Sequence, residues 1–249
     1  MALWYPKASR SAVAPVNGGS FVGGAHKGLL HTTEGSTASG AISSYRQSGF
    51  WPHFTASYEG GTFRIWQHIP INRAARALAN LAGGAQTNRA NVIQIELVGF
   101  ATNPPSAPRY LAGIAEWMRW VEANFAVPRR STVRFKAYPA SYGRNNGVRL
   151  SASAWTGYGG WLGHMHAPEN LHGDPGAINI QALLAGGEAP ERDERDEDMA
   201  LSDDDKRWIT DTVAALIKKA MFARPAAGAL TPVEALKLLA REQAASSDT

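Results

Sequence analysis

The chain has 249 residues, of which 44% are hydrophobic and 18% charged, enough apolar material for a buried core in one or two domains. It contains no cysteine, which excludes a disulfide framework, a thiolate zinc finger, an iron–sulfur cluster and a cysteine nucleophile. The formal net charge is +4, and no run of about 18 apolar residues occurs, so we expect no membrane-spanning helix.

Hydrophobic periodicity predicts regular structure in six segments of the first 187 residues. In chain order they are a buried strand over 27–31, a helix from a Ser36 cap to about Gln47, a hairpin of strands 53–58 and 62–67 that turns at Gly60-Gly61, a strand over 91–98, and a helix over 109–125. Residues 126–176 are rich in Gly, Pro and Ser, and we expect them to be irregular. This alternation of strands and helices indicates an α/β fold with one central sheet.

The composition changes after Gly187. Residues 188–199 carry mixed charges and almost no apolar side chains, which predicts a solvated linker between a domain over 1–187 and a helical segment over 200–249. Residues 1–187 contain 16 basic and 7 acidic side chains, whereas residues 188–249 contain 9 and 14. The positive charge of the first part favours an anionic polymer as partner, and both nucleic acid and a bacterial cell wall qualify. We expect the helical segment to contact a second copy of the chain or the wall.

Glu96 stands in the apolar sequence Val-Ile-Gln-Ile-Glu-Leu-Val, where its neighbours indicate burial. A buried carboxylate costs several kcal/mol unless it is paired, hydrogen-bonded, protonated or near a metal. The alternative is ordinary strand alternation, in which Gln94, Glu96 and Val98 share a face that points to solvent. The segment by itself leaves both interpretations open.

Histidines and one acid gather in the segment GHMHAPENLHGDPG. They are His164, His166, His172 and Asp174. In a chain without thiolates, imidazole and carboxylate are the expected zinc ligands. A catalytic zinc site has three protein ligands and one open position for water, and a nearby carboxylate such as Glu96 can take the proton of that water. The alternative for this segment is a histidine-rich surface loop. His31, at the end of the strand over 27–31, could likewise be a hydrogen-bonded surface residue and not a ligand.

Four motifs occur in an order that resembles the zinc-dependent N-acetylmuramoyl-L-alanine amidases, which share a fold with the peptidoglycan recognition proteins. The motifs are HTTEG from His31, PHF from Pro52, the strand IQIELVG, and GHMHAPENLHGDPG. They are most similar to the amidase domains of actinobacteriophage endolysins, over about residues 25–185. The resemblance implies a central mixed sheet flanked by helices, with a zinc groove along one face.

The resemblance also implies roles for particular residues. The three zinc ligands of the family fall on His31, His164 and Asp174, with one zinc ion per chain. The catalytic carboxylate of the family falls on Glu96. A lysine that is thought to stabilise the oxyanion is replaced here by His172, whose imidazole could donate the same hydrogen bond.

Other residues receive weaker predictions. His166 is expected to orient a ligand, and it remains the rival second ligand. His53 is expected to be a buried, hydrogen-bonded residue beside the groove, and Thr32 to lie next to the first ligand or the groove. Asn88 and Arg89 are expected to contact the peptide of the substrate.

The function implied by the resemblance is that of an endolysin that hydrolyses the amide between N-acetylmuramic acid and L-alanine in bacterial peptidoglycan. One alternative is a non-catalytic peptidoglycan-binding module of the same fold, although such relatives lose a zinc ligand. Nucleic-acid binding is a further alternative, but the basic residues are scattered and no motif accompanies them, so we expect no nucleic-acid partner.

We read no secretory signal in the opening residues MALWYPKASR. We therefore expect a phage lysin that is made in the cytoplasm of the host bacterium and reaches the wall after a pore opens, which leads to host lysis. A bacterial cytosolic amidase that acts on recycled wall fragments would fit equally.

Overall fold

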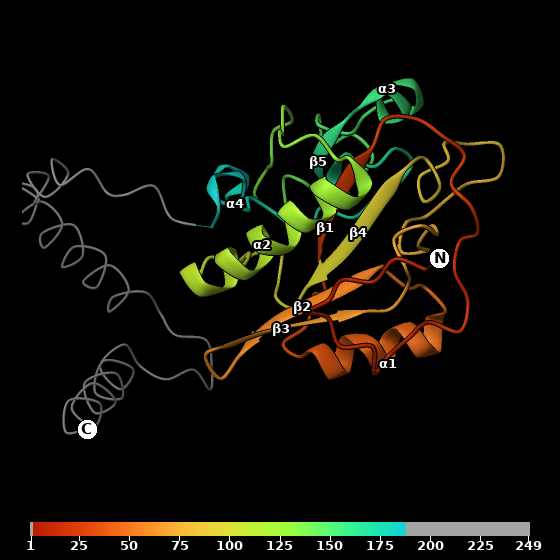
Figure 1. Cartoon of the computed structure of the whole chain (residues 1–249). Coiled ribbons are helices and arrows are strands. Elements are labelled where there is room, and N and C mark those ends of the chain that lie inside the picture. Colours follow the sequence, from red (N-terminus) through yellow and green to blue (C-terminus); the bar gives the residue numbers. More distant parts are fainter. Residues whose placement is uncertain (1, 188–249) are drawn as a thin grey trace, which may run out of the picture. The chain divides into compact units, whose positions relative to one another are not determined.

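The computed structural model describes residues 2–187. The predicted linker over 188–199 and the predicted helical segment over 200–249 lie outside the described residues. Residues 2–187 form an α/β fold with one mixed sheet flanked by helices, which confirms the predicted fold class (Figure 1). None of the helices in this part of the chain is long and apolar enough to cross a membrane.

The sheet has five strands in the order β3-β2-β4-β1-β5. They are β1 (Lys27–Thr32), β2 (Phe54–Glu59), β3 (Thr62–Gln67), β4 (Val92–Leu97) and β5 (Gly160–Gly163). β1 pairs in parallel with β4 and β5, and β2 pairs in parallel with β4, whereas the edge strand β3 is antiparallel to β2. The first four strands lie within one residue of their predicted bounds.

Helices cover both faces of the sheet. They are α1 (Ala38–Ser48), α2 (Pro108–Phe125), α3 (Ala152–Gly157) and α4 (Ile180–Ala185), with a 3-10 turn η1 over His164–His166. The cap of α1 is Thr37 rather than the expected Ser36, because the Thr37 hydroxyl accepts a hydrogen bond from Gly40 N at 3.2 Å. α1 and α2 lie on opposite sides of the sheet, and α4 lies beside α2 (Figure 1).

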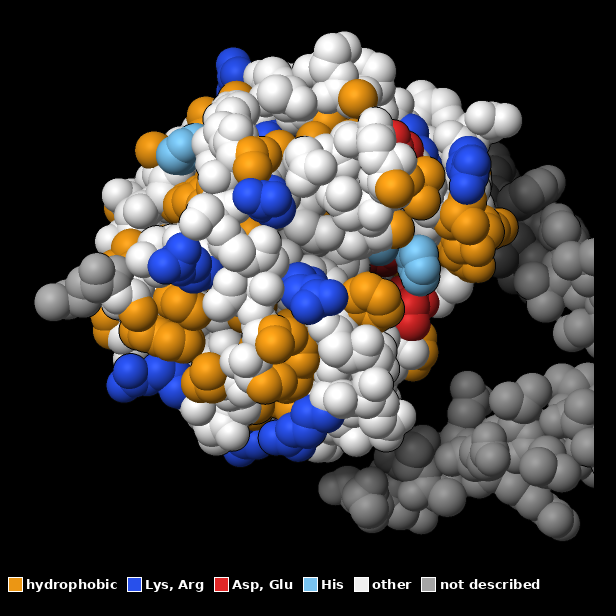
Figure 2. Space-filling model, turned by 90° about the vertical axis from the view of Figure 1, so that its right-hand side faces the viewer, with side chains coloured by type: hydrophobic (Ala, Val, Ile, Leu, Met, Phe, Trp, Pro, Cys, Tyr) orange, Lys and Arg blue, Asp and Glu red, His pale blue; other side chains and the backbone are white. Residues whose placement is uncertain are grey.

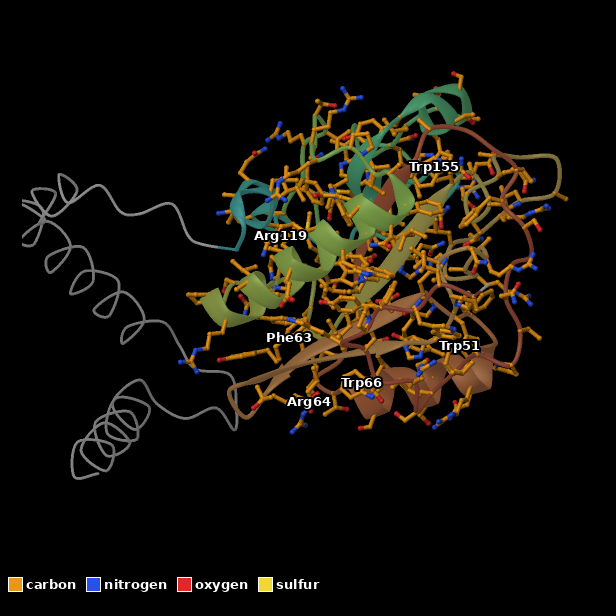
Figure 3. All side chains as sticks on the ribbon, in the orientation of Figure 1. Trp51, Phe63, Arg64, Trp66, Arg119 and Trp155 are labelled. Atoms are coloured by element: carbon orange, nitrogen blue, oxygen red, sulfur yellow. The ribbon has the colours of Figure 1, made fainter. Side chains whose placement is uncertain are left out.

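The two faces of the sheet differ in chemistry. The face toward α2 is apolar, and its buried side chains include Leu30, Phe54, Ile93 and Ile95 of the strands and Trp117 and Met118 of α2. The edge strand β3 contributes to both faces: Phe63 packs with the α2 side, and Trp66 packs with the α1 side (Figure 3). Because successive residues of a strand point to opposite faces, the remaining side chains of β1, β2 and β4 line the face toward α1.

Three polar side chains form a row across the face toward α1. His31 of β1 is in register with Glu96 of β4, which is in register with Thr55 of β2. The alternative in which Gln94 and Glu96 point to solvent is wrong, because α1 covers this face and Tyr45 of α1 lies within hydrogen-bonding distance of Thr55. Gln94 is fully buried, and the Glu96 side chain is only 14% exposed.

The segment 126–176, expected to be irregular, contains α3 and β5. β5 reads Gly-Trp-Leu-Gly and lacks the β-branched residues that favour a strand. It joins the sheet because the ring of Trp161 packs over Gly28 of β1, where a Cβ atom would come within 2.2 Å of the ring. Trp161 Nε1 also donates a hydrogen bond to Glu122 at 2.9 Å, which fixes the ring. β5 leads directly into His164, so this packing positions the site.

Gly28→Ala should lower the free energy of unfolding by about 1–3 kcal/mol, because the added methyl group overpacks against the Trp161 ring. Chemical denaturation measures the change. The control is Gly157→Ala, where nothing lies within 4 Å of the added Cβ and we expect a change within about 0.5 kcal/mol. A Gly28→Ala protein as stable as the wild type would contradict this account of β5.

Candidate metal centre

Two imidazoles and one carboxylate meet at the edge of the sheet where β1 and β5 end. His31 is in β1, His164 follows β5, and Asp174 lies in the loop beyond it; all three are buried. His31 Nδ1 lies 3.1 Å from His164 Nδ1 and 3.3 Å from Asp174 Oδ2, and His164 Nδ1 lies 3.1 Å from Asp174 Oδ1. The structure therefore brings together three of the residues for which the sequence predicts zinc binding.

The spacing of these atoms fits a zinc ion. Tetrahedral zinc with bonds of about 2.0–2.2 Å separates its ligand atoms by about 3.3–3.6 Å, close to the separations observed here. Asn170 Oδ1 accepts a hydrogen bond from His164 Nε2 at 3.0 Å, so the proton of a neutral His164 is on Nε2. The lone pair on His164 Nδ1 then faces the Asp174 carboxylate. Two hydrogen-bond acceptors that face each other repel, and a cation bound between them removes this repulsion.

Electrostatics around Asp174 favour its ionised form. Burial by itself would raise its pKa, but the positive charge and N–H donors that His164 and His31 present when protonated outweigh burial and hold the pKa of Asp174 well below its usual value. The backbone N–H of Thr32 also donates to Asp174 Oδ2 at 3.3 Å. Burial lowers the pKa of His31, which keeps its imidazole neutral. An ionised carboxylate and neutral imidazoles are the forms in which these groups bind a metal.

Glu96 lies beside the cluster with an unused carboxylate oxygen. Its Oε1 is 3.8 Å from His31 Nδ1, and its Oε2 is buried without a hydrogen-bond partner within the described part of the chain. Burial raises the pKa of Glu96 well above its ordinary value, and the negative charges of Asp174 and Glu34 raise it further. A carboxyl group with a raised pKa next to a metal site suits proton transfer near neutral pH.

His172 lies at the mouth of the site. Its ring stacks on that of His164 with centroids 4.9 Å apart, and its Nδ1 is 4.0 Å from Asp174 Oδ1. The side chain is 67% exposed, in contrast to the buried cluster below it. This position would let its imidazole contact a bound ligand.

The cluster opens into a groove of about 330 Å³. The lining residues from the strand ends and the histidine loop are Thr32, Thr33, Glu34, Glu96, His164, His172 and Asp174, and those from α1 and the loops beside it are Ala41, Ser44, Tyr45, Ser48, Phe50 and Ala77. Glu34 has a positive φ of 49°, and its carboxylate accepts hydrogen bonds from the Thr32 hydroxyl and from Ala101 N. Figure 2 shows histidine and acidic side chains next to each other at one margin of that view, among hydrophobic ones.

Two other histidines with predicted roles form hydrogen bonds with backbone groups through both ring nitrogens. His166 Nδ1 accepts a hydrogen bond from Gly163 N, and its Nε2 donates to Arg134 O, so neither nitrogen faces the cluster as a rival second ligand would. His53 Nδ1 accepts from Gln94 N, and its Nε2 donates to a backbone carbonyl. Burial lowers the pKa of both rings to about 4.

Asn88 also has a framework role in the structure. Its amide hydrogen-bonds the backbone of Leu78 in both directions and accepts from the Gln94 side chain. Asn88 and Arg89 line a separate depression, not the groove over the metal cluster.

Asn170 is a site residue that the sequence analysis did not single out. Its side chain forms a hydrogen bond with His164 and two more with the backbone N–H and C=O of Ala79. These bonds connect the histidine loop to the segment beside the groove. A ligand histidine usually donates its second N–H to an acceptor, so an amide between His164 and Asp174 is a signal that could have identified Asn170.

The chain has distant structural neighbours among known proteins. No protein-family model and no curated protein matches the sequence. Among solved structures, the chain is similar to the hydrolase AmiA of Staphylococcus aureus, with 14% identity, a TM-score of 0.46, and coverage of 74% of this chain and 84% of that one. It is also similar to the N-acetylmuramoyl-L-alanine amidase LysC of Clostridium intestinale, with 12% identity, a TM-score of 0.45, and coverage of 72% of this chain and 93% of that one. The Ph2119 endolysin of a Thermus scotoductus bacteriophage has the same identity and coverages, with a TM-score of 0.42.

Asp174→Asn should abolish stoichiometric zinc binding, because an amide removes the negative charge that the two imidazoles surround. His172→Ala is the control, since this exposed ring lies outside the three-residue cluster, and it should keep about one zinc ion per chain. Metal analysis of the purified proteins measures both. Full zinc content in Asp174→Asn would contradict the assigned ligand set.

Proposed function

We propose that this chain is a zinc-dependent N-acetylmuramoyl-L-alanine amidase of the phage endolysin type, which hydrolyses the amide between N-acetylmuramic acid and L-alanine in bacterial peptidoglycan. The observation that carries the proposal is the buried cluster of His31, His164 and Asp174 with the unpartnered carboxylate oxygen of Glu96 beside it. The four sequence motifs that resemble this amidase family support the choice of substrate.

In the proposed hydrolysis, different residues of the site bind the metal and transfer the proton. His31 Nδ1, His164 Nδ1 and an Asp174 carboxylate oxygen would hold one zinc ion. When bound, zinc polarises the scissile carbonyl and lowers the pKa of the attacking water to about 7. Glu96 Oε2 takes the proton of the water and delivers it to the departing amine of L-alanine. The raised pKa of Glu96 suits it to both transfers.

His172 supplies a hydrogen bond to the oxygen that becomes negative when water attacks. Partial desolvation where the ring stacks against the site lowers the pKa of His172, and the adjacent His164 lowers it further, so the ring donates as a neutral imidazole. Its place at the mouth of the groove leaves the N–H free to meet a substrate that enters from solvent.

The cellular setting of the proposal rests on the motif resemblance. Residues 1–187 would be the catalytic domain, and residues 200–249, beyond the linker over 188–199, would bind a second copy or the wall. The enzyme would be made in the host cytoplasm and would reach the wall through a pore. The excess of basic side chains in residues 1–187 would speed association with the anionic wall, and salt would slow it.

Glu96→Gln tests the function directly, since it keeps the shape of the side chain and removes its capacity to accept a proton. We expect the variant to bind zinc normally and to clear suspensions of purified cell walls at least about 100-fold more slowly than the wild type. EDTA should stop clearing by the wild type. Glu116→Gln, a half-exposed position on α2 whose side chain pairs with Lys7, is the control and should clear walls at the wild-type rate. Clearing by Glu96→Gln at a similar rate would refute the assigned role of Glu96, and failure of the wild type to clear walls would refute the function.

A further inference from the structure

Arg149 donates hydrogen bonds to four main-chain carbonyl groups around the metal centre. Its Nε donates to Gly143 O at 2.9 Å, and its Nη2 donates to His172 O at 2.9 Å. Its Nη1 donates to Ala167 O at 2.9 Å and to His164 O at 3.4 Å. One guanidinium group therefore contacts both Gly143 and the loop that carries the histidines.

Three of these carbonyls belong to one loop, residues 164–172, which begins with a proposed ligand and ends two residues before Asp174. Only η1, at the start of this loop, is regular structure, so most of its carbonyl groups have no sheet or helix partner. The guanidinium is a planar group with five N–H donors in fixed directions, which allows one side chain to hold several carbonyls at set spacings. These bonds restrict the separation of His164 and His172, and with it the position of Asp174 two residues later.

The backbone of Arg149 and its neighbours is itself held in place by hydrogen bonds. Its backbone N–H donates to Asn146 Oδ1 at 3.0 Å, and Asn146 Nδ2 donates to Met165 O at 3.0 Å. The next residue, Leu150, donates its N–H to His166 O at 3.0 Å. The guanidinium thus acts from a segment that is already fastened to the histidine loop.

The same arrangement fastens the segment around Gly143 to the histidine loop. Gly143 receives Arg149 at its carbonyl group and donates its N–H to Leu171 O at 2.7 Å. The adjacent Tyr142 is half exposed, and its backbone N would lie 2.7 Å from a Cβ added at Gly173. These contacts couple the segment around Gly143 to the proposed ligand loop.

We propose that Arg149 is a positioning residue that pre-organises the metal-ligand loop and thereby sets the affinity of the centre for zinc. Ligands held in place before the ion arrives lose less conformational freedom when it binds. Residues that orient metal ligands from behind typically change metal affinity by about 10–100-fold when they are replaced. The inference rests on the proposed function in one respect, namely that the cluster is a zinc site.

Two substitutions separate this role from general stabilisation. Arg149→Lys keeps the positive charge, but a single ammonium group cannot hold four separated carbonyls, and Arg149→Gln removes the charge as well. The matched control is Arg129→Lys, whose Nε donates to Leu184 O at 3.0 Å, a carbonyl outside the histidine loop. Zinc dissociation constants are measured by competition with a coloured chelator, at a temperature where circular dichroism shows the zinc-free proteins to be folded.

We expect zinc binding to weaken about 10-fold in Arg149→Lys and by up to about 100-fold in Arg149→Gln, with less than about a twofold change in Arg129→Lys. A residue that only supports the fold would lower the unfolding temperature of the zinc-free protein and leave the dissociation constant unchanged. An unchanged constant in both Arg149 variants therefore overturns the proposal.

Amide hydrogen exchange in the wild type provides a test that needs no variant to fold. Zinc should slow exchange at the N–H groups of Gly143 and Leu150, which are fastened to the loop. Absence of this protection overturns the proposal. A wild type that binds zinc but leaves walls intact would refute the proposed function and not the role of Arg149. Wall lysis together with unaltered zinc affinity in the Arg149 variants would refute the role of Arg149 and not the proposed function.

Discussion

Because β1 pairs in parallel with β4 on one side and with β5 on the other, three segments that are distant in the sequence end at the same edge of the sheet. This pairing places His31 in register with Glu96, and it places Leu30, the residue before His31, in register with Gly163, the residue before His164. The polar row would not exist without the apolar packing on the opposite face, since burial of one face toward α2 turns the alternate residues toward α1.

Two carboxyl groups in this small volume have pKa values that are shifted in opposite directions. Asp174 is surrounded by His164 and His31, which hold its pKa down, whereas Glu96 has no hydrogen bond to its Oε2 within residues 2–187, and burial raises its pKa. The same burial thus has different consequences because the neighbours differ. In the proposed function, this difference separates an acid that stays ionised to hold a metal from an acid that gains and loses a proton.

Local patterns predicted most of the sheet, because four strands carry apolar runs or alternation, and helix α2 carries a continuous apolar stripe. β5 was not predicted, since Gly160 to Gly163 joins the sheet through the fit of Trp161 over Gly28, which is a tertiary contact. For the site, composition and the motif resemblance selected the histidines and acids that meet. Residues that act through backbone contacts, such as Arg149, carry no pattern of their own, because their partners are carbonyl groups that every residue possesses.

The most direct test of the account is the position of the oxygen atom that hydrolysis adds. The full chain loaded with zinc would be incubated with a defined muramyl peptide in water enriched in oxygen-18, and the products would be analysed by mass spectrometry. We expect one labelled oxygen in the lactyl carboxylate of the sugar product, together with a peptide that begins with a free L-alanine amine. Label at a new reducing end of the sugar, or cleavage at another bond of the peptide, would contradict the account.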